Sequence, residues 1–189
     1  MDHSVEERLP PGQRLVTDFP VLHSGPVMRV DPASWSLTVS GLIDPGLSLD
    51  WEGLLALPAT EQVSDIHCVT DWTKLDTHWR GVRVSDLLKG QVTKPEACHV
   101  VVHAYGGWTT NLPLGELLMD DVLVAYEYEG RPISAEHGGP VRLLVPRLYL
   151  WKSAKWLRGI EFTEEQRLGF WEVRGYHALG DPWREQRYS

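Results

Sequence analysis

The sequence is poor in cysteine, since only Cys68 and Cys98 occur among its 189 residues. Two cysteines make no disulfide framework, so we expect both to remain thiols, free to act as a ligand or a nucleophile. The chain also lacks a Gly-x-Gly-x-x-Gly sequence and a regular alternation of strands with long helices. These absences disfavour a Rossmann domain.

Long apolar runs and an excess of positive charge are absent as well. No stretch approaches 18 consecutive apolar residues, and residues 1–8 hold neither an apolar leader nor a twin arginine. We therefore expect a cytoplasmic protein that does not span a membrane. A net charge of -8 argues against a nucleic-acid partner, because phosphate binding needs a basic stripe. The basic cluster from Arg142 to Lys155 stands out locally and favours a small anionic ligand.

Length and a hydrophobic content of 42% fit one globular domain. We expect residues 1–14 to form a flexible polar lead and residues 15–189 to form the domain. The hydrophobic patterns predict strands over 34–40, 63–69, 98–104, 108–110, 122–128, 141–145 and 158–163. They also predict three short helices: one capped by Asp50 that ends at residue 57, one over 86–89 capped by Ser85, and one over 114–119. Many short strands with a few short helices indicate an α+β fold of mixed and antiparallel sheets.

Cys68 lies near the end of the predicted strand 63–69, where a side chain can face a cleft. It is open to three interpretations: an inert buried cysteine, a nucleophile, or a thiolate ligand to a metal. A nucleophile needs a base, and neighbouring His67 points to the opposite face of a strand. A ligand needs only a positive centre that keeps the thiol deprotonated. Cys98 more plausibly packs in the core.

A zinc site is a weaker alternative. Strong zinc patterns are close pairs of ligands such as Cys-x-x-Cys. Here His99 and His103 lie four residues apart on a predicted strand, which separates them by about 13 Å. The clustered candidates are His67, Cys68, His78, Cys98, His99 and His103.

Residues 136–156 have the composition of an anion site. A phosphate needs positive charge, neutral donors and backbone that approaches closely. Solvated surface charge remains the alternative for each cation taken singly, and His137 either donates to a heterocycle or closes a turn. The segment supplies these features through Gly138, Gly139, Arg142, Lys152, Ser153 and Lys155.

Nine tryptophans are many for this length. Most are expected to pack in the core or on the surface, with the alternative that one or two wall a flat heterocycle. Four of them, Trp151, Trp156, Trp171 and Trp183, crowd the last quarter of the chain. The aromatic tail from 170 to 188 either covers the core or presents a docking face.

Three motifs follow one another in the order His67-Cys68-Val69-Thr70-Asp71-Trp72, Gly139-Pro140-Val141-Arg142 and Lys152-Ser153-Ala154-Lys155-Trp156. Together they resemble the molybdopterin-binding domain of the sulfite oxidase family. The likeness runs from about residue 19 to the C-terminus, where 170–177 and 180–183 resemble the small cytosolic bacterial branch. It implies a sulfite oxidase-like fold and molybdenum-molybdopterin as the cofactor.

The resemblance implies roles residue by residue. Cys68 would bind molybdenum beside the two dithiolene sulfurs of one molybdopterin. The residues at positions that hold the pterin and its phosphate are Arg142, Ser153, Ala154 and Lys155, with His137, His23 and His103 at further pterin contacts. We expect the rest of the pocket lining to include Trp72, Lys74, Tyr105 and Tyr149, the first two next to the reacting atoms.

Two departures from the family matter. Sulfite oxidases carry an arginine a few residues past the cysteine, whereas this chain has Asp71 and Trp72, and its first cation is Lys74. This difference makes sulfite a doubtful substrate. The 189 residues also hold no haem domain and no immunoglobulin-like domain, so we expect a separate electron-transfer protein as partner.

The resemblance implies an oxidoreductase that transfers an oxygen atom to or from a small substrate, which is an S-oxide, an N-oxide or a small sulfur compound. Two alternatives stay open. One is a non-catalytic module that binds molybdopterin or another phosphorylated ligand, and the other is a cysteine-dependent hydrolase.

Overall fold

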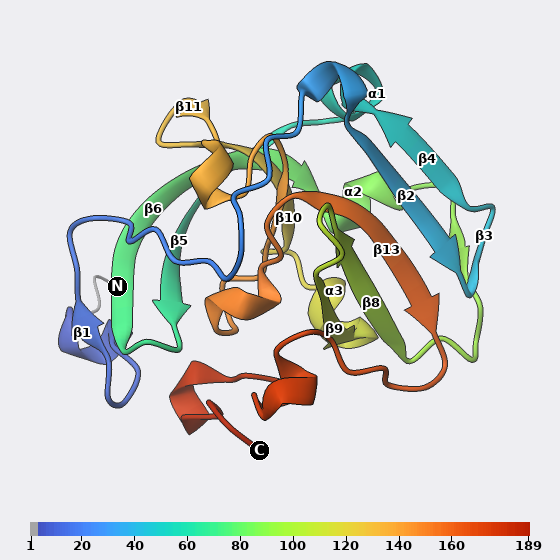
Figure 1. The fold of residues 1–189 in the computed structure, drawn as a ribbon. Coiled ribbons are helices and arrows are strands. Elements are labelled where there is room, and N and C mark those ends of the chain that lie inside the picture. The colour runs from blue at the N-terminus through green and yellow to red at the C-terminus, as the bar shows by residue number, and fades with distance from the viewer. Residues whose placement is uncertain (1–3) are drawn as a thin grey trace.

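Two β-sheets build the protein, and the computed structural model describes residues 4–189. In Figure 1 the first sheet curls around the left half of the molecule and the second lies on the right. The first sheet contains β1 (Arg14–Leu15), β5 (Thr60–Cys68), β6 (Trp72–Arg83), β10 (Leu123–Tyr128), β11 (Arg131–Pro132) and β12 (Arg142–Leu144).

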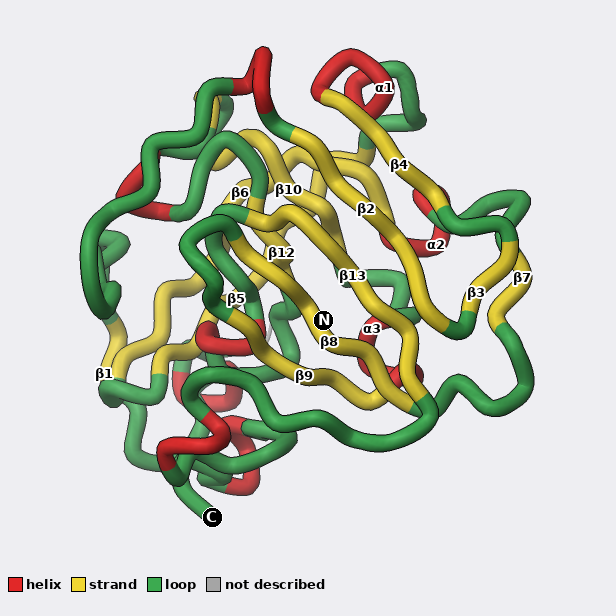
Figure 2. Tube along the Cα trace, turned by 45° about the vertical axis from the view of Figure 1, so that its right-hand side comes forward, coloured by secondary structure: helices red, strands yellow, loops and turns green. Residues whose placement is uncertain are grey.

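The second sheet has the order β4 (Leu47–Asp50), β2 (Ser36–Gly41), β13 (Leu157–Thr163), β8 (His99–Ala104) and β9 (Thr109–Pro113), which Figure 2 shows side by side. Strands β3 (Ile43–Asp44) and β7 (Val92–Thr93) form a separate ribbon. Strand β1 pairs in parallel with β6, and β13 with β2, whereas the other strand pairings are antiparallel.

Helices are few and short. The α-helices are α1 (Trp51–Leu55), α2 (Val84–Leu87) and α3 (Leu114–Leu117), and the 3-10 turns are η1 (Glu6–Arg8), η2 (Pro32–Ser34), η3 (Ala135–His137), η4 (Leu150–Lys152), η5 (Glu172–Arg174) and η6 (Pro182–Arg184). This architecture confirms the expected α+β class with mixed sheets. No helix within residues 4–189 is both long and apolar enough to cross a membrane.

Local signals placed the α-helices and several strands correctly, but they missed β6, a strand of 12 residues. Asp50 caps α1 as expected, because its carboxylate accepts a hydrogen bond of 2.8 Å from Gly53 N. The expected cap at Ser85 is wrong: α2 begins at Val84, and Arg83 precedes it without a side-chain cap. Here the chain leaves β6 directly into the helix, and Val84 is buried.

Hydrophobic residues cover both faces of the first sheet. Strand β10 shows this by alternation: Val124 and Tyr126 pack into the core between the two sheets, while Leu123 and Ala125 pack into a second cluster on the outer face. That second cluster also contains Cys68. The Cys68 thiol therefore lies on a packed face of the sheet.

The expectation that Cys98 packs in the core is wrong, because Cys98 is exposed. It precedes β8 at the end of the second sheet, where the buried neighbour is Ala97. The alternation that buries Val100 and Val102 ends where the strand ends.

The N-terminal lead is attached to the first sheet in the part that the structure describes. Arg8 Nη2 lies 2.6 Å from Asp65 Oδ1 and 2.5 Å from Asp76 Oδ1. Gln13 donates a hydrogen bond of 3.1 Å to the carbonyl of Cys68. These contacts differ from the expected flexible lead, and β1 crosses the expected boundary at residue 14. Residues 1–3 lie outside the described part.

The C-terminal segment, residues 169–189, runs below both sheets in Figure 1 and is tied to them by a buried ion pair. Lys152 Nζ lies 2.6 Å from Glu172 Oε1, and both side chains are 0% exposed. Burial lowers the pKa of Lys152, and the charge of Glu172 opposes this shift. Lys152 also donates hydrogen bonds to the carbonyls of Asn111 and Ala178. Glu172 also accepts hydrogen bonds from Thr110 Oγ1 and Trp151 Nε1.

We predict that Lys152→Met lowers the free energy of unfolding by about 3–5 kcal/mol, because Glu172 would be left as a buried charge without its counter-ion. Urea denaturation followed by circular dichroism measures this change. The matched control is Lys89→Met, since Lys89 is 73% exposed and pairs with Asp86 at the surface. That variant should change stability by less than about 1 kcal/mol. Equal stabilities of the two variants would contradict the prediction.

Candidate functional site

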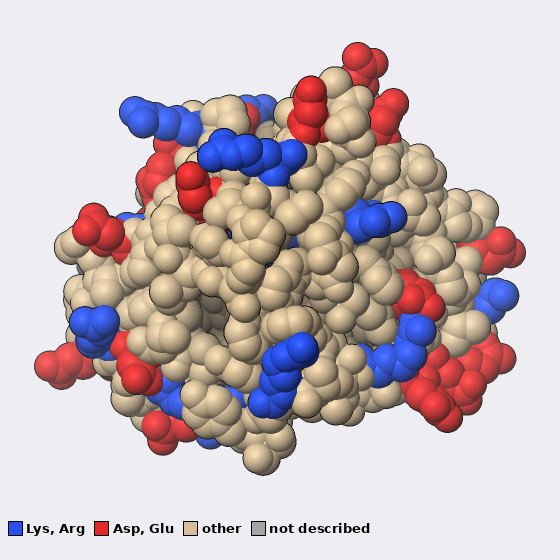
Figure 3. Space-filling model, in the orientation of Figure 1, with Lys and Arg blue, Asp and Glu red and all other residues tan. Residues whose placement is uncertain are grey.

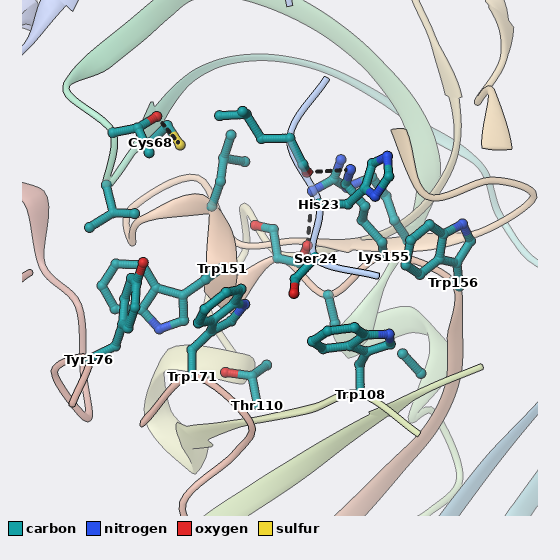
Figure 4. A pocket seen from close by; sticks show the side chains of 18 of the residues that line it. His23, Ser24, Cys68, Trp108, Thr110, Trp151, Lys155, Trp156, Trp171 and Tyr176 are labelled. Carbon is teal, nitrogen blue, oxygen red and sulfur yellow. Dashed lines mark hydrogen bonds between the residues drawn. The ribbon is translucent and has the colours of Figure 1, made fainter. Parts of the chain in front are cut away.

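A cavity of about 300 Å³ lies where the two sheets and the C-terminal segment meet. Its lining comes from within residues 19–24, 68–72, 104–110, 142–156 and 171–176. Figure 4 shows Cys68 on one side of the cavity and His23, Ser24 and Lys155 on the other. In Figure 3 the middle of this face carries few charged side chains and is hollowed left of centre.

A tight turn places Cys68 in the cavity. Strand β5 ends at Cys68, and its partner β6 begins at Trp72. The turn closes with a hydrogen bond of 3.2 Å from Asp71 N to the Cys68 carbonyl, and Asp71 has a φ of 67°. Asp tolerates this left-handed conformation better than most residues. The expected position of Cys68 at a strand end, facing a cleft, is confirmed.

The thiol itself is sheltered. Cys68 is 8% exposed, and its Sγ lies 3.2 Å from Thr70 Oγ1, within hydrogen-bond reach. Burial raises the pKa of Cys68, and the hydrogen bond to Thr70 opposes that shift. A neutral thiol is therefore favoured until a positive centre approaches it.

His67 faces the other way, as strand alternation predicts. Its Nδ1 lies 2.8 Å from Thr73 Oγ1, and its ring lines a separate open cleft of about 640 Å³. Burial lowers the pKa of His67 to about 4. His67 is thus no base for the Cys68 thiol.

Two cations lie on the side of the cavity away from Cys68. Arg142 is 1% exposed and donates hydrogen bonds of 2.7 Å and 2.9 Å to the carbonyls of His137 and Ser153. Lys155 donates bonds of 2.8 Å and 2.5 Å to the carbonyls of Leu22 and Glu136. Neither cation forms a salt bridge within residues 4–189.

Both cations have a lowered pKa. Burial lowers the pKa of Arg142 to about 10. Burial and the nearby charge of Arg142 lower the pKa of Lys155 to about 8. Two positive charges with neutral carbonyl partners form a site that an anion would stabilise.

Close backbone packing shapes this basic side. Gly138 has a φ of 101°, and a Cβ there would lie 2.7 Å from the Lys155 Cβ. A Cβ on Gly139 would lie 1.9 Å from the Ile133 carbonyl oxygen. The glycine pair therefore lets the turn after η3 approach Lys155. Ser153 and Ala154 line the cavity beside it, and the Ser153 hydroxyl accepts a hydrogen bond of 2.9 Å from Val145 N.

Of the expected histidine contacts, only His23 lines the cavity. Its Nδ1 lies 3.0 Å from the Gly25 carbonyl. The ring of His137 stacks on the ring of Phe19, with 4.0 Å between the centroids. Phe19 lines the cavity, whereas His137 lies behind it and outside the lining. Burial lowers the pKa of His137 to about 4. Its buried Nδ1 has no hydrogen-bond partner in the described part of the chain.

Other expected residues do not meet at the cavity. His103 bonds to Glu161 at 3.0 Å, because in β8 it is the next residue, Ala104, that faces the cavity. Lys74 donates to the Thr17 carbonyl at 2.6 Å. The remaining residues outside the lining are Tyr105, which accepts a hydrogen bond from Ser36 N, Tyr149, which stacks on Trp151, and Lys152, which pairs with Glu172.

Trp72 does line the cavity, and its buried Nε1 lacks a hydrogen-bond partner among the described residues. Sequence reasoning missed several aromatic neighbours, among them Trp108, Trp151, Trp171 and Tyr176. The high tryptophan content was the available signal, but it does not tell which rings the fold brings together. Within residues 4–189, no three His, Cys, Asp or Glu side chains lie close enough to hold a metal ion.

Comparison with known proteins adds independent evidence. Residues 24–171 match the family described as the oxidoreductase molybdopterin binding domain. A Bacillus subtilis protein named uncharacterized oxidoreductase YuiH is 50% identical over 96% of this chain and 92% of its own length. A putative protein-methionine-sulfoxide reductase subunit, YedZ1 of Azospira oryzae, is 28% identical over 82% of the chain and 58% of its own length.

Longer relatives share only this domain. Mitochondrial sulfite oxidase of Drosophila melanogaster is 29% identical over 85% of this chain, which spans 33% of that protein. The crystal structure of the sulfane dehydrogenase SoxCD from Paracoccus pantotrophus has the same fold, with a TM-score of 0.66 and 23% identity over 74% of this chain and 40% of that one. The sulfite oxidase-like fold and the resemblance seen in the sequence are confirmed. The protein belongs to the oxidoreductase molybdopterin-binding domain family, and it is a molybdopterin-dependent oxidoreductase with molybdenum-molybdopterin as its cofactor.

Proposed function

We propose that the protein transfers an oxygen atom to or from a small organic S-oxide, N-oxide or sulfur compound, with Cys68 as the protein ligand of molybdenum. One observation carries the proposal: a buried thiol, a buried arginine and a half-buried lysine, both cations without carboxylate partners in the described part of the chain, line a single cavity. Relatives named sulfite oxidase and protein-methionine-sulfoxide reductase support a reaction at sulfur.

The residues of the basic side fit the phosphate and pterin of the cofactor. Arg142 and Lys155 would hold the phosphate, because both are cations at the cavity that hydrogen-bond to carbonyls and have no carboxylate partner within residues 4–189. Ser153, Ala154 and His23 line the same side. His137 is the further candidate for a pterin contact, since its buried Nδ1 lacks a partner among the described residues.

The residues of the thiol side fit a metal ligand. When bound, the cofactor supplies two-electron redox chemistry at molybdenum. Because burial raises the pKa of Cys68, the thiol needs a bound positive centre to lose its proton at neutral pH. The Thr70 hydroxyl would then donate to the thiolate and moderate its strength as a donor.

The distribution of charge favours an organic oxide over sulfite. In the turn after Cys68 no residue is cationic, and the first lysine, Lys74, donates to the Thr17 carbonyl outside the cavity lining. Arg187 reaches this turn, but it is paired with Asp71 and lies outside the cavity lining. An oxyanion beside Cys68 would therefore lose its hydration without an unpaired cation from this turn to compensate. In the reductive direction the S–O or N–O bond breaks, the substrate gains two electrons, and the oxygen leaves as water after taking up two protons.

The electrons for this reduction need a donor, and we propose a separate electron-transfer protein in the cytoplasm for that role. The relatives named as subunits of larger reductases support a partner. The two alternatives from the sequence are less well supported. A cysteine hydrolase needs a base at Cys68, and His67 faces another cleft. A non-catalytic module would hold the cofactor yet turn over none of these substrates.

We predict that Lys155→Met lowers the molybdopterin content of the purified protein about tenfold or more, since a charged hydrogen bond contributes about 1.5–3 kcal/mol. Pterin fluorescence after oxidation and elemental analysis of molybdenum measure the content. Lys94→Met is the control, because Lys94 is exposed and lies outside the cavity. Unchanged cofactor content in the Lys155 variant would refute the assignment of this side to the phosphate.

The two cysteines allow a matched test of the ligand. Cys68→Ser should lower turnover of S-oxides about 100-fold or more and alter the molybdenum electron paramagnetic resonance signal, because the thiolate donor is lost. Pterin content should persist, since the basic side is unchanged. Cys98→Ser, at the exposed cysteine, should match the wild type in both respects. Wild-type resonance and turnover in the Cys68 variant would exclude the proposed ligation.

A further inference from the structure

The wall of the cavity near Cys68 is aromatic. Trp151 and Tyr176 pack edge to face with ring centroids 5.1 Å apart, and Trp171 lies 5.0 Å from Tyr176. All three rings line the cavity. Figure 4 shows them together below Cys68, with the hydroxyl end of Tyr176 directed toward the side that holds the thiol.

The C-terminal segment supplies two of these rings and is held firmly in place. Phe170 N donates a hydrogen bond of 2.9 Å to the Thr109 carbonyl, and a Cβ on Gly169 would lie 2.4 Å from the Thr110 Cα. Glu172, next to Trp171, is fixed by Lys152. The wall is therefore part of the folded body and is preorganised for a ligand.

The far end of the segment is tied to the cysteine turn itself. Arg187 donates a hydrogen bond of 2.7 Å to the Val69 carbonyl and forms an ion pair with Asp71. Thus the segment that carries Tyr176 and the turn that carries Cys68 are joined directly. Their relative position is fixed by contacts independent of any ligand.

The polar groups on this side are few. The Thr70 hydroxyl is engaged with the Cys68 sulfur. The Tyr176 hydroxyl makes no hydrogen bond to any residue in 4–189. Burial raises the pKa of Tyr176, so this hydroxyl is a donor at neutral pH. Among the aromatic faces, the Tyr176 hydroxyl and the indole N–H of Trp72, which is unpartnered among the described residues, are donors that fit a ligand with a strong acceptor and an apolar body.

We propose that Tyr176 is the specificity-determining residue of the pocket: its ring, with Trp151 and Trp171, selects an uncharged organic oxide with a flat or bulky apolar group, and its hydroxyl donates a hydrogen bond to the oxide oxygen. The inference rests on the proposed function and names its substrate class. It assigns to the C-terminal segment a direct part in substrate choice.

The test uses the cofactor-loaded protein with a reduced dye as electron donor and compares methyl phenyl sulfoxide with dimethyl sulfoxide. The wild type should have a kcat/KM for the aryl substrate at least about tenfold above that for the alkyl one. Tyr176→Ala should bring this ratio close to one, mainly through KM. Tyr176→Phe should keep the ratio and lower both kcat/KM values about threefold to tenfold, as expected for one lost hydrogen bond.

A binding measurement separates this inference from the proposed function. Calorimetric titration with methyl phenyl sulfone, which is an acceptor without the reducible sulfoxide, should show weaker binding in both Tyr176 variants than in the wild type. Tyr188→Phe is the matched control, because Tyr188 is 65% exposed and lies outside the cavity lining. It should match the wild type in turnover, sulfone binding and molybdenum content.

The outcomes are distinct. Turnover of sulfoxides with the same substrate ratio and sulfone affinity in wild type and Tyr176 variants would overturn the role of Tyr176 and leave the proposed function intact. A loaded wild type that reduces neither sulfoxide would overturn the proposed reductive function. In that case the sulfone titration alone decides whether Tyr176 forms a binding wall for an uncharged oxide.

Discussion

The buried pair between Lys152 and Glu172 is the contact on which the rest of the site depends. It joins η4, whose last residue is Lys152, to η5 in the C-terminal segment, and it includes groups of β9 as well. Together with the contacts of Phe170 and Arg187, this attachment fixes the C-terminal part of the aromatic wall relative to Cys68. A charged pair in such a place costs desolvation, but breaking it costs more, so it specifies one arrangement of the segment.

A second constraint is the positive charge of the cavity. Arg142 and Lys155 hydrogen-bond to carbonyls and lie over aromatic rings, and burial lowers the pKa of each because no carboxylate within residues 4–189 pairs with its charge. A ligand that carries negative charge offsets the cost of this burial and, by binding the folded state alone, stabilises the fold. The same residues thus connect the stability of the protein to its loading with cofactor.

Much of the fold was predictable because its signals are local. Asp50, as an N-cap residue, predicts the start of α1, and the alternating pattern around Leu37 and Val39 predicts β2. Cys68, Arg142 and Lys155 could be placed at one site because their motifs carry the family resemblance. Which ring stands beside them could not be predicted, since Trp151, Trp171 and Tyr176 meet only through the tertiary fold.

The errors share a physical cause. His103 and Lys152 both lie next to a residue that lines the cavity, Ala104 and Ser153, and a shift of one position in an extended or tightly turned chain reverses the direction of a side chain. Cys98 lies one residue beyond the strand whose alternation would have buried it. Sequence motifs therefore locate the segment that forms a site, whereas the direction of each side chain depends on where the strand or turn begins. These side-chain directions make the cavity basic on one side and aromatic on the other. The basic side suits a phosphate, and the aromatic side suits an uncharged substrate.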